Sequence, residues 1–174
     1  MIIQTGMRTD IPAFYAKWFF NRIEEGFVCV RNPYNPIQVT KYSLSPEVVD
    51  LIAFCTKNPA PMIPSLDRLK PYGQYWFVTI TPYGKDIEPN VPDKENVIES
   101  FQRLSGVVGV ESVGWRYDPI FLDEKHPMEW HITEFDKMAH ALCGYTRTCV
   151  ISFLDLYQKV KRNFPQAQAV AKKD

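Results

Sequence analysis

The length and charge balance of the chain limit the kinds of protein it can be. Its 174 residues suffice for one domain with a sizeable core, and 45% of them are hydrophobic. Twenty basic residues balance twenty acidic ones, so no overall field favours nucleic acid or an anionic membrane surface. No apolar run is long enough to cross a bilayer. We therefore expect no nucleic-acid partner and no membrane partner.

The N-terminus and the cysteines indicate a compartment. The chain does not begin with a basic region followed by an apolar stretch, which a signal peptide requires. Its four cysteines follow neither a disulfide-scaffold pattern nor a CxxC pattern: Cys29, Cys55, Cys143 and Cys149. We expect a cytoplasmic protein with reduced thiols, and we expect Cys149 to point into the core.

The first third of the chain predicts a strand, a helix and a hairpin. A short strand over residues 1–5 precedes Asp10, which can cap a helix that ends at Gly26. The aromatic side chains expected to cover a sheet are Phe14, Trp18 and Phe19. Strands over 27–31 and 37–42 flank a turn rich in Asn and Pro, and together they predict a hairpin arm. A short helix is then expected to open at Ser45.

The rest of the chain alternates between strands and helices. The strand 51–56 is almost wholly apolar, which is typical of a strand buried on both faces of a parallel sheet. Further strands are predicted over 75–81, 113–117 and 148–153. Between them come a brief helix near 65–70, an irregular loop over 82–92, a helix capped by Asp93, and a helix that begins near Met128 and ends at Gly144. A basic helix over 155–163 and a polar tail over 164–174 complete the chain.

This alternation predicts an α/β fold with a parallel sheet. About five βα units are expected, which is more than half of an eightfold TIM barrel but too few to close one. An open doubly wound sheet is the alternative, and it usually carries a glycine-rich loop after its first strand. Residues 6–10 contain one glycine, so we favour a partial TIM-barrel-like domain over residues 1–163, with a hairpin arm after its first helix.

Polar residues follow each main strand of the predicted sheet. In such folds, ligands bind where the carboxyl ends of the parallel strands meet. Three cations are expected there, three carboxylates that are also candidate catalytic bases, and three neutral hydrogen-bonding residues. These are Arg8, Lys57 and Arg116; Asp10, Asp118 and Asp155; and Thr9, Asn58 and Thr81. Since Arg binds carboxylate or phosphate in a bidentate manner, the group predicts a site for a small anionic ligand.

Structural roles are the alternative for several of these residues. Asp10 can serve as a helix cap alone. Arg116 and Asp118 can neutralise each other across neighbouring strands. The histidines show no metal-ligand spacing, and His131 and His140 fall on nearly opposite faces of one helix, so surface or capping roles are expected for them. The basic residues of the last helix predict a solvated face.

Several motifs give the chain a family resemblance. They are RTDIPAFY (8–15), VRNPYNP (30–36), TKNPAP (56–61), IEPNVP (87–92), WRYDP (115–119), YTR (145–147) and SFLD (152–155). In this order they resemble a bacterial family known as domain of unknown function eighteen-forty-eight. The resemblance implies a TIM-barrel-like fold, similar in outline to radical S-adenosylmethionine enzymes and spore photoproduct lyase. It also implies S-adenosylmethionine or an iron–sulfur cluster as cofactor, held by a C-terminal cysteine cluster. This chain has no clustered cysteines, so the cluster ligands are absent from it.

Three hypotheses for function follow. The first is an enzyme-like barrel, truncated relative to its family, with an anion-binding pocket at the carboxyl ends of its strands. The second is a non-catalytic interaction domain that dimerises, or pairs with a partner chain, through the open edge of the barrel. The third is an iron–sulfur protein completed by cysteines of a partner. The sequence leaves the reaction, and whether there is one, open.

Overall fold

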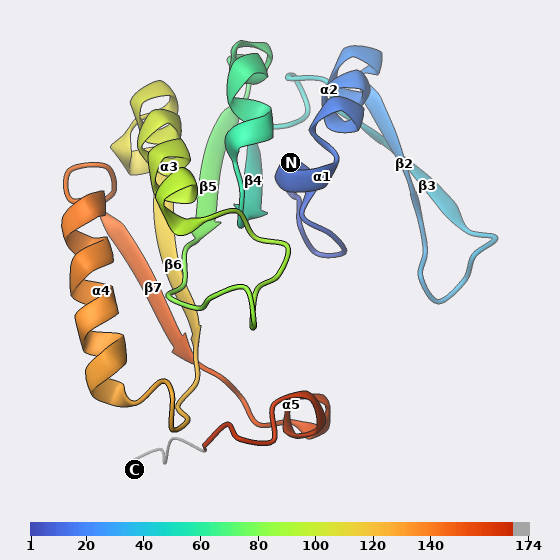
Figure 1. Cartoon of the computed structure of the whole chain (residues 1–174). Coiled ribbons are helices and arrows are strands. Elements are labelled where there is room, and N and C mark those ends of the chain that lie inside the picture. Colours follow the sequence, from blue (N-terminus) through green and yellow to red (C-terminus); the bar gives the residue numbers. More distant parts are fainter. Residues whose placement is uncertain (169–174) are drawn as a thin grey trace.

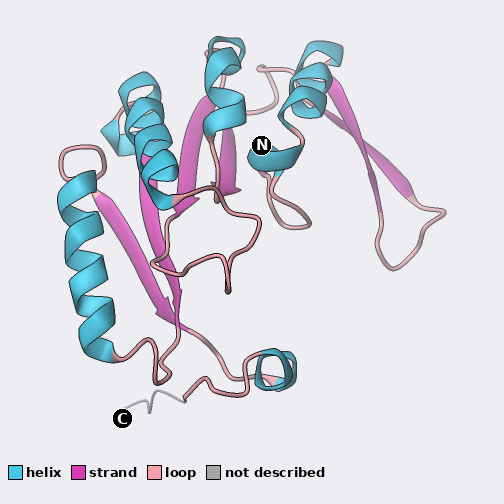
Figure 2. Cartoon of the chain, in the orientation of Figure 1, coloured by secondary structure: helices cyan, strands magenta, loops and turns pink. Residues whose placement is uncertain are grey.

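The computed structural model, which describes residues 1–168, contains a five-stranded parallel sheet (Figures 1 and 2). The strands lie in the order β1-β4-β5-β6-β7, and each is parallel to its neighbours. Their bounds are Ile2–Gln4 (β1), Leu51–Thr56 (β4), Gly73–Thr79 (β5), Val113–Ile120 (β6) and Thr148–Phe153 (β7). This confirms the predicted α/β fold, and the unclosed order is consistent with a partial barrel.

The helices cover one face of the sheet. Along that face lie α2 (Ala16–Glu25), the 3₁₀ helix η1 (Ala60–Leu69), α3 (Lys94–Val108) and α4 (Met128–Leu142) (Figure 1). The shorter helices are α1 (Ile11–Phe14), η2 (Val110–Ser112) and α5 (Gln158–Asn163). Asp10 caps α1, as predicted, and α2 ends at Gly26, whose φ of 73° is readily adopted by glycine alone.

The predicted hairpin is also present. Strands β2 (Phe27–Arg31) and β3 (Val39–Ser43) pair antiparallel and extend away from the sheet as an arm (Figure 1). The ammonium group of Lys41 lies 3.9 Å from the centre of the Phe27 ring, a cation–π contact at the base of the arm.

The core is built on the helix-covered face of the sheet. Side chains of β4 alternate between buried and half-buried, so that Ile52 and Phe54 face the helices. The Phe54 ring stacks on Trp76 of β5 at 3.9 Å between centroids. The expectation that β4 is buried on both faces is therefore wrong. Half-buried residues such as Cys55 and Phe77 occupy the other face, which the described helices do not cover.

Several local predictions need correction. Phe14 and Trp18 are 65% and 45% exposed, and it is Phe19 and Phe20 that are buried. The helix is interrupted at Tyr15, which separates Phe14 from the axis of α2, and within α2 the buried side of the helix carries Phe19 and Phe20 instead of Trp18. No helix opens at Ser45; its hydroxyl accepts a hydrogen bond from the Glu47 amide within a turn instead.

Other elements differ in extent or exposure. The brief helix expected near 65–70 is a 3₁₀ helix that already begins at residue 60, and α5 begins at residue 158 instead of 155. Cys149 is exposed because β7 is an edge strand with β6 as its one neighbour in the sheet. In the expected tail, Phe164 packs against Phe121, and the Gln168 amide donates to the Leu122 carbonyl. The remainder of the tail, 169–174, lies outside the described residues, and the boundary at 163 stays a prediction.

Candidate functional site

The parallel sheet brings the ends of its strands to one edge, where three loops meet. These are residues 5–10 after β1, residues 57–59 after β4 and residues 80–93 after β5. Most of the polar residues predicted to form a site lie in these loops, and Arg116 and Asp118 lie in the second half of β6. We call this side of the molecule the carboxyl edge.

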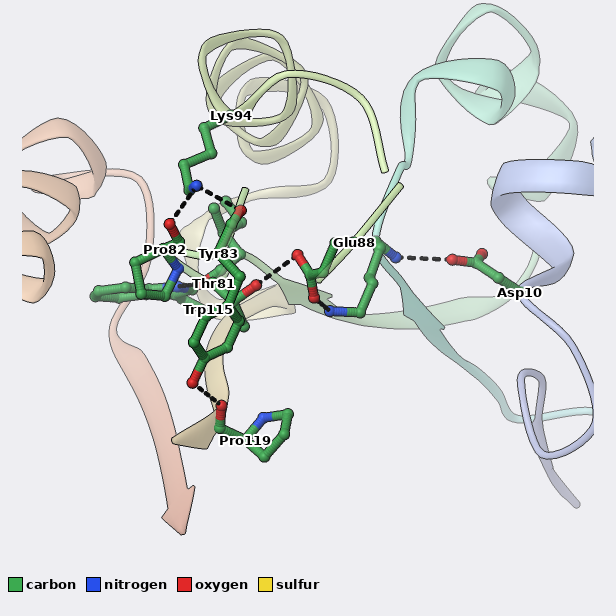
Figure 3. Close-up of polar contacts among 10 residues, drawn as sticks. Asp10, Thr81, Pro82, Tyr83, Glu88, Lys94, Trp115 and Pro119 are labelled. Atoms are coloured by element: carbon green, nitrogen blue, oxygen red, sulfur yellow. Dashed lines mark hydrogen bonds and ion pairs between the residues drawn. The ribbon is translucent and has the colours of Figure 1, made fainter. Parts of the chain in front are cut away.

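Asp10 connects the first two of these loops. Its Oδ1 accepts a hydrogen bond from the Ala13 amide at 3.0 Å. Its Oδ2 accepts one from the Lys57 amide at 2.7 Å (Figure 3). Both carboxylate oxygens thus bind backbone groups. The capping role is confirmed, and Asp10 also holds the loop after β1 against the end of β4.

Lys57 and Thr81 converge on a residue that the sequence did not single out as part of the site. The Lys57 ammonium group lies 2.5 Å from Glu88 Oε1, and the Thr81 hydroxyl donates to Glu88 Oε2 at 2.7 Å (Figure 3). Glu88 belongs to the irregular loop over 82–92. Its place between two predicted site residues could not be read from the sequence, because loop residues carry no periodic signal. Asn58 takes a separate role, since its side chain accepts from the Ala60 amide at the start of η1.

Arg116 and Asp118 form a second polar group. They form an ion pair with each other, and the Ser152 hydroxyl of β7 donates to the same carboxylate. Neutralisation is therefore confirmed, although the two residues lie on one strand and not on neighbouring ones. Asp155 is exposed, and its side chain makes no hydrogen bond or ion pair with the described residues.

A cavity of about 510 Å³ opens beside the loop after β1. It lies between that loop and the hairpin arm, and Arg8, Thr9, Tyr15, Trp18 and Arg31 are among its lining residues. The Arg8 guanidinium donates to the Arg31 carbonyl at 3.0 Å, which ties the loop to the arm. No Asp or Glu of the described chain lines the cavity. Its lining therefore includes two arginines and no carboxylate-bearing residue among those that the structure describes.

The structure buries His131 against the end of β6, a position that the sequence did not predict. His131 is buried, and its Nε2 lies 2.9 Å from the Phe121 carbonyl oxygen, which requires Nε2 to be the donor. Its Nδ1 then accepts from the Tyr117 hydroxyl at 2.9 Å. Burial lowers the pKa of His131, and the nearby His126 lowers it further. The expected surface or capping role is wrong, because the helix face that carries His131 packs on the end of β6.

Two tyrosines in the same region are held as neutral hydroxyls. Burial raises the pKa of Tyr83 and the pKa of Tyr117. Tyr83 donates to the Pro119 carbonyl at 2.8 Å (Figure 3), and it accepts from the Phe121 amide at 3.1 Å. These hydrogen bonds fix the loop after β5 against the end of β6, so the two tyrosines serve packing more than proton transfer.

The cofactors implied by the resemblance can be tested against the cysteines. Cys29 lies in β2, Cys55 in β4 and Cys149 in β7, while Cys143 follows α4. Within residues 1–168, no group of three or more His, Cys, Asp or Glu side chains is arranged to hold a metal ion. The thiolates of the described chain therefore do not fit an iron–sulfur cluster, which needs several of them together.

Comparisons with known proteins give one match. The model of a family described as domain of unknown function (DUF1848) matches residues 2–174. Neither the curated proteins nor the solved structures contain a match to the chain. In the part of the chain that the structure describes, no helix has both the length and the apolar character that a membrane crossing needs.

Proposed function

We propose that this chain, which belongs to the DUF1848 family, binds a small anion with an aromatic or apolar portion at the carboxyl edge. The ligand would occupy the cavity between the loop after β1 and the hairpin arm. The observation that carries the proposal is the charge of that cavity, which is lined by Arg8 and Arg31 and by no carboxylate of the described residues.

The other cations of the carboxyl edge are less suited to hold an anion. Lys57 is paired with Glu88 and Arg116 with Asp118, so a ligand would have to displace a carboxylate from either. Arg8 and Arg31 form no ion pair with the described residues. A planar guanidinium group can bind a carboxylate or phosphate through two parallel hydrogen bonds. These two arginines are therefore the anion-binding groups of the proposal.

The remaining lining residues indicate the rest of the ligand. Tyr15 and Trp18 line the cavity and stay largely exposed, although rings of this size normally bury most of their surface. A cavity of about 510 Å³ lies in the usual range for small-molecule sites. A ligand with a flat ring or an apolar chain would cover these two aromatic side chains and remove their exposed surface from water. Nucleotide-like anions have this combination of groups. S-adenosylmethionine shares the adenine and a carboxylate but also carries an ammonium and a sulfonium group, so it should bind more weakly than AMP.

The proposal assigns binding and no catalysis, because the carboxylates of the carboxyl edge lie outside the cavity. Asp10 holds the loop that carries Arg8, and both of its oxygens are already engaged by backbone amides. Asp118 is engaged by Arg116 and Ser152. Neither is free to accept a proton from a ligand without first losing these partners, and Asp155 does not line the cavity, so catalysis by Asp10, Asp118 or Asp155 is left out of the proposal.

Calorimetric titration tests the proposal with matched ligands. AMP and S-adenosylmethionine are compared with adenosine, which has the ring but no anionic group, and with inorganic phosphate, which has the charge but no ring. AMP should bind more tightly than either fragment. Arg8→Gln and Arg31→Gln should each weaken AMP binding about tenfold or more, whereas Arg103→Gln, an exposed site on α3, should not. Equal binding of AMP and adenosine would exclude the proposed anion site.

The exposed edge strand favours a second candidate function. All but one of the six residues of β7 are exposed, including Ile151 at 57% and Phe153 at 41%. An edge strand with apolar side chains and unpaired backbone groups is suited to pair with another strand. The chain has no net charge to keep copies apart. We propose a second copy of the chain as the partner, paired along β7.

The oligomeric state decides this second candidate. Light scattering coupled to gel filtration should show a dimer that dissociates on dilution, and Ile151→Lys should shift the protein to monomer at the same concentration. Val107→Lys, at an exposed apolar position on α3, is the matched control and should leave the dimer intact. A wild-type protein that stays monomeric at high concentration would rule the pairing out.

A further inference from the structure

A buried aspartate–histidine pair lies beside a separate cavity of the carboxyl edge. Asp123 and His126 follow β6, are 6% and 8% exposed, and meet at 2.8 Å between Asp123 Oδ1 and His126 Nδ1. Both line a cavity of about 350 Å³. Its other walls come from Asp86 and Ile87 of the loop after β5 and from Gln166 and Gln168 near the end of the described chain. None of these residues belongs to the cavity beside Arg8.

The hydrogen bonds around Asp123 determine which nitrogen of His126 carries the proton. Asp123 Oδ1 also accepts from the backbone amides of Lys125 at 3.0 Å and His126 at 2.7 Å. Because this oxygen already accepts from two amides, it acts as an acceptor towards the ring as well, so Nδ1 of His126 is the donor. In the neutral ring, the lone pair is then on Nε2.

Nε2 of His126 is available to a ligand. Nε2 forms no hydrogen bond with the described residues. Every fully buried side-chain nitrogen or oxygen of the described residues does have a hydrogen-bond partner. Nε2 is therefore not fully enclosed by protein atoms, although the residue as a whole is more than nine-tenths buried. Since His126 lines the cavity, this is where a ligand would meet it.

The imidazole ring is held rigidly by its surroundings. Trp130 packs against it at 4.6 Å between centroids, Phe121 at 5.4 Å and Tyr83 at 5.6 Å, all in edge-to-face geometry. Such packing fixes the direction of Nε2, so a ligand would not have to order the ring when it binds.

The charges of the cavity point to the class of ligand. Its lining includes three acidic residues, Asp86, Asp123 and Glu124, and one basic residue, Lys125. Gln166 and Gln168 add two amide groups whose oxygens accept hydrogen bonds. We propose that this cavity binds a small organic cation with N–H donors, such as a primary diamine. Nε2 of His126 accepts a hydrogen bond from one ammonium group, and Asp86 and Glu124 attract the other.

Three four-carbon probes distinguish the recognition of ammonium groups from unspecific binding of polar molecules. Putrescine carries two ammonium groups, butanediol has hydroxyl groups in the same places, and succinate has carboxylates there. Long-range nitrogen–proton NMR of the imidazole reports the state of each ring nitrogen. The free protein should show His126 protonated at Nδ1. Putrescine should shift the His126 Nε2 signal in a saturable way, and butanediol and succinate should not.

Variants locate the cation within the cavity. Asp86→Asn combined with Glu124→Gln changes two exposed side chains without changing their shape, and should weaken putrescine binding roughly threefold to tenfold. Glu99→Gln, on an exposed position of α3, should have no effect. His126→Gln should abolish the saturable putrescine binding if the variant folds. If this variant does not fold, the putrescine affinity of the Asp86→Asn, Glu124→Gln variant tests the proposal. A His126 ring protonated at Nε2, equal binding of butanediol, or unchanged affinity of the double variant would overturn the proposal.

Discussion

The ammonium group of Lys57 lies 2.5 Å from the carboxylate of Glu88, which joins the end of β4 to the loop after β5. The same loop is held at two further points. Thr81 donates to Glu88, and the Lys94 ammonium group donates to the carbonyls of Pro82 and Tyr83 (Figure 3). Burial lowers the pKa of Lys94, because its ammonium group is partly removed from water. A loop that reads as irregular in the sequence is thus fixed from three neighbouring elements.

Glu88→Gln should loosen this loop. The substitution keeps the shape of the side chain but removes the charge that Lys57 and Thr81 share. We expect a loss of about 1–2 kcal/mol in the free energy of unfolding, which is below the roughly 1.5–3 kcal/mol of a hydrogen bond to a charged group because the Lys57 side chain is 36% exposed. Amide hydrogen exchange should accelerate within residues 82–92 and hardly at all in β4. Unchanged exchange there would mean that Lys94 holds the loop without Glu88.

Asp10 offers a graded pair of substitutions. Asp10→Ala removes the acceptors of the Ala13 and Lys57 amides, and should lower the free energy of unfolding by about 2 kcal/mol. Asp10→Asn keeps one oxygen but turns an NH₂ group towards the other amide, so its effect should be intermediate. Urea unfolding measures both. If Asn is as destabilising as Ala, the charge matters more than the cap.

The buried His131 makes stability depend on pH. Its pKa in the folded protein lies below the ordinary value of 6.5, chiefly because burial disfavours the charged ring. In acid, the unfolded chain therefore binds more protons at this residue than the folded one does. The stability contributed by the neutral ring is present above about pH 6.5 and is lost as pH falls towards the lowered folded pKa.

Denaturant unfolding at a series of pH values measures this effect. His131→Gln should be less stable than the wild type near pH 7, since Gln cannot reproduce both ring hydrogen bonds, and its stability should fall less between about pH 7 and pH 5. His140→Gln is the control, because His140 is exposed near the end of α4 and should leave the pH profile of the wild type unchanged. Parallel profiles for wild type and His131→Gln would show that another group causes the loss.

Phe54 tests the core of the covered face. It is fully buried between Phe19, at 5.5 Å between ring centroids, and Trp76, at 3.9 Å. Phe54→Ala should lower the free energy of unfolding by about 3–5 kcal/mol, and Phe54→Leu by less because most of the volume remains. Phe77→Leu, on the half-buried face of the neighbouring strand, should be milder than Phe54→Leu. The reverse order would show that the uncovered face is as tightly packed as the other.

Local chemistry allowed much of the fold to be predicted. The strands 51–56 and 148–153 were predicted with the bounds that the structure has, and Asp10 and Gly26 were correctly placed as caps. A cap depends on one side chain and the next turn of backbone, and a strand on its own run of apolar residues, so neighbouring residues contain the information. The same holds for the hairpin, whose turn chemistry lies between its strands.

The partners of the polar residues depended on the tertiary structure. Lys57 and Glu88 are 31 residues apart, and the Arg8 side chain meets the Arg31 carbonyl because the loop after β1 lies beside the arm. No local pattern connects such pairs, since the contact exists only after the strands have assembled in parallel. The sequence by itself determined which edge of the sheet is polar and that His126 and Asp123 are near neighbours. Burial, which removes water from their surroundings, decided that these two residues form a rigid pair, and the packing of the loop after β1 beside the arm decided which residues line a cavity together with Arg8.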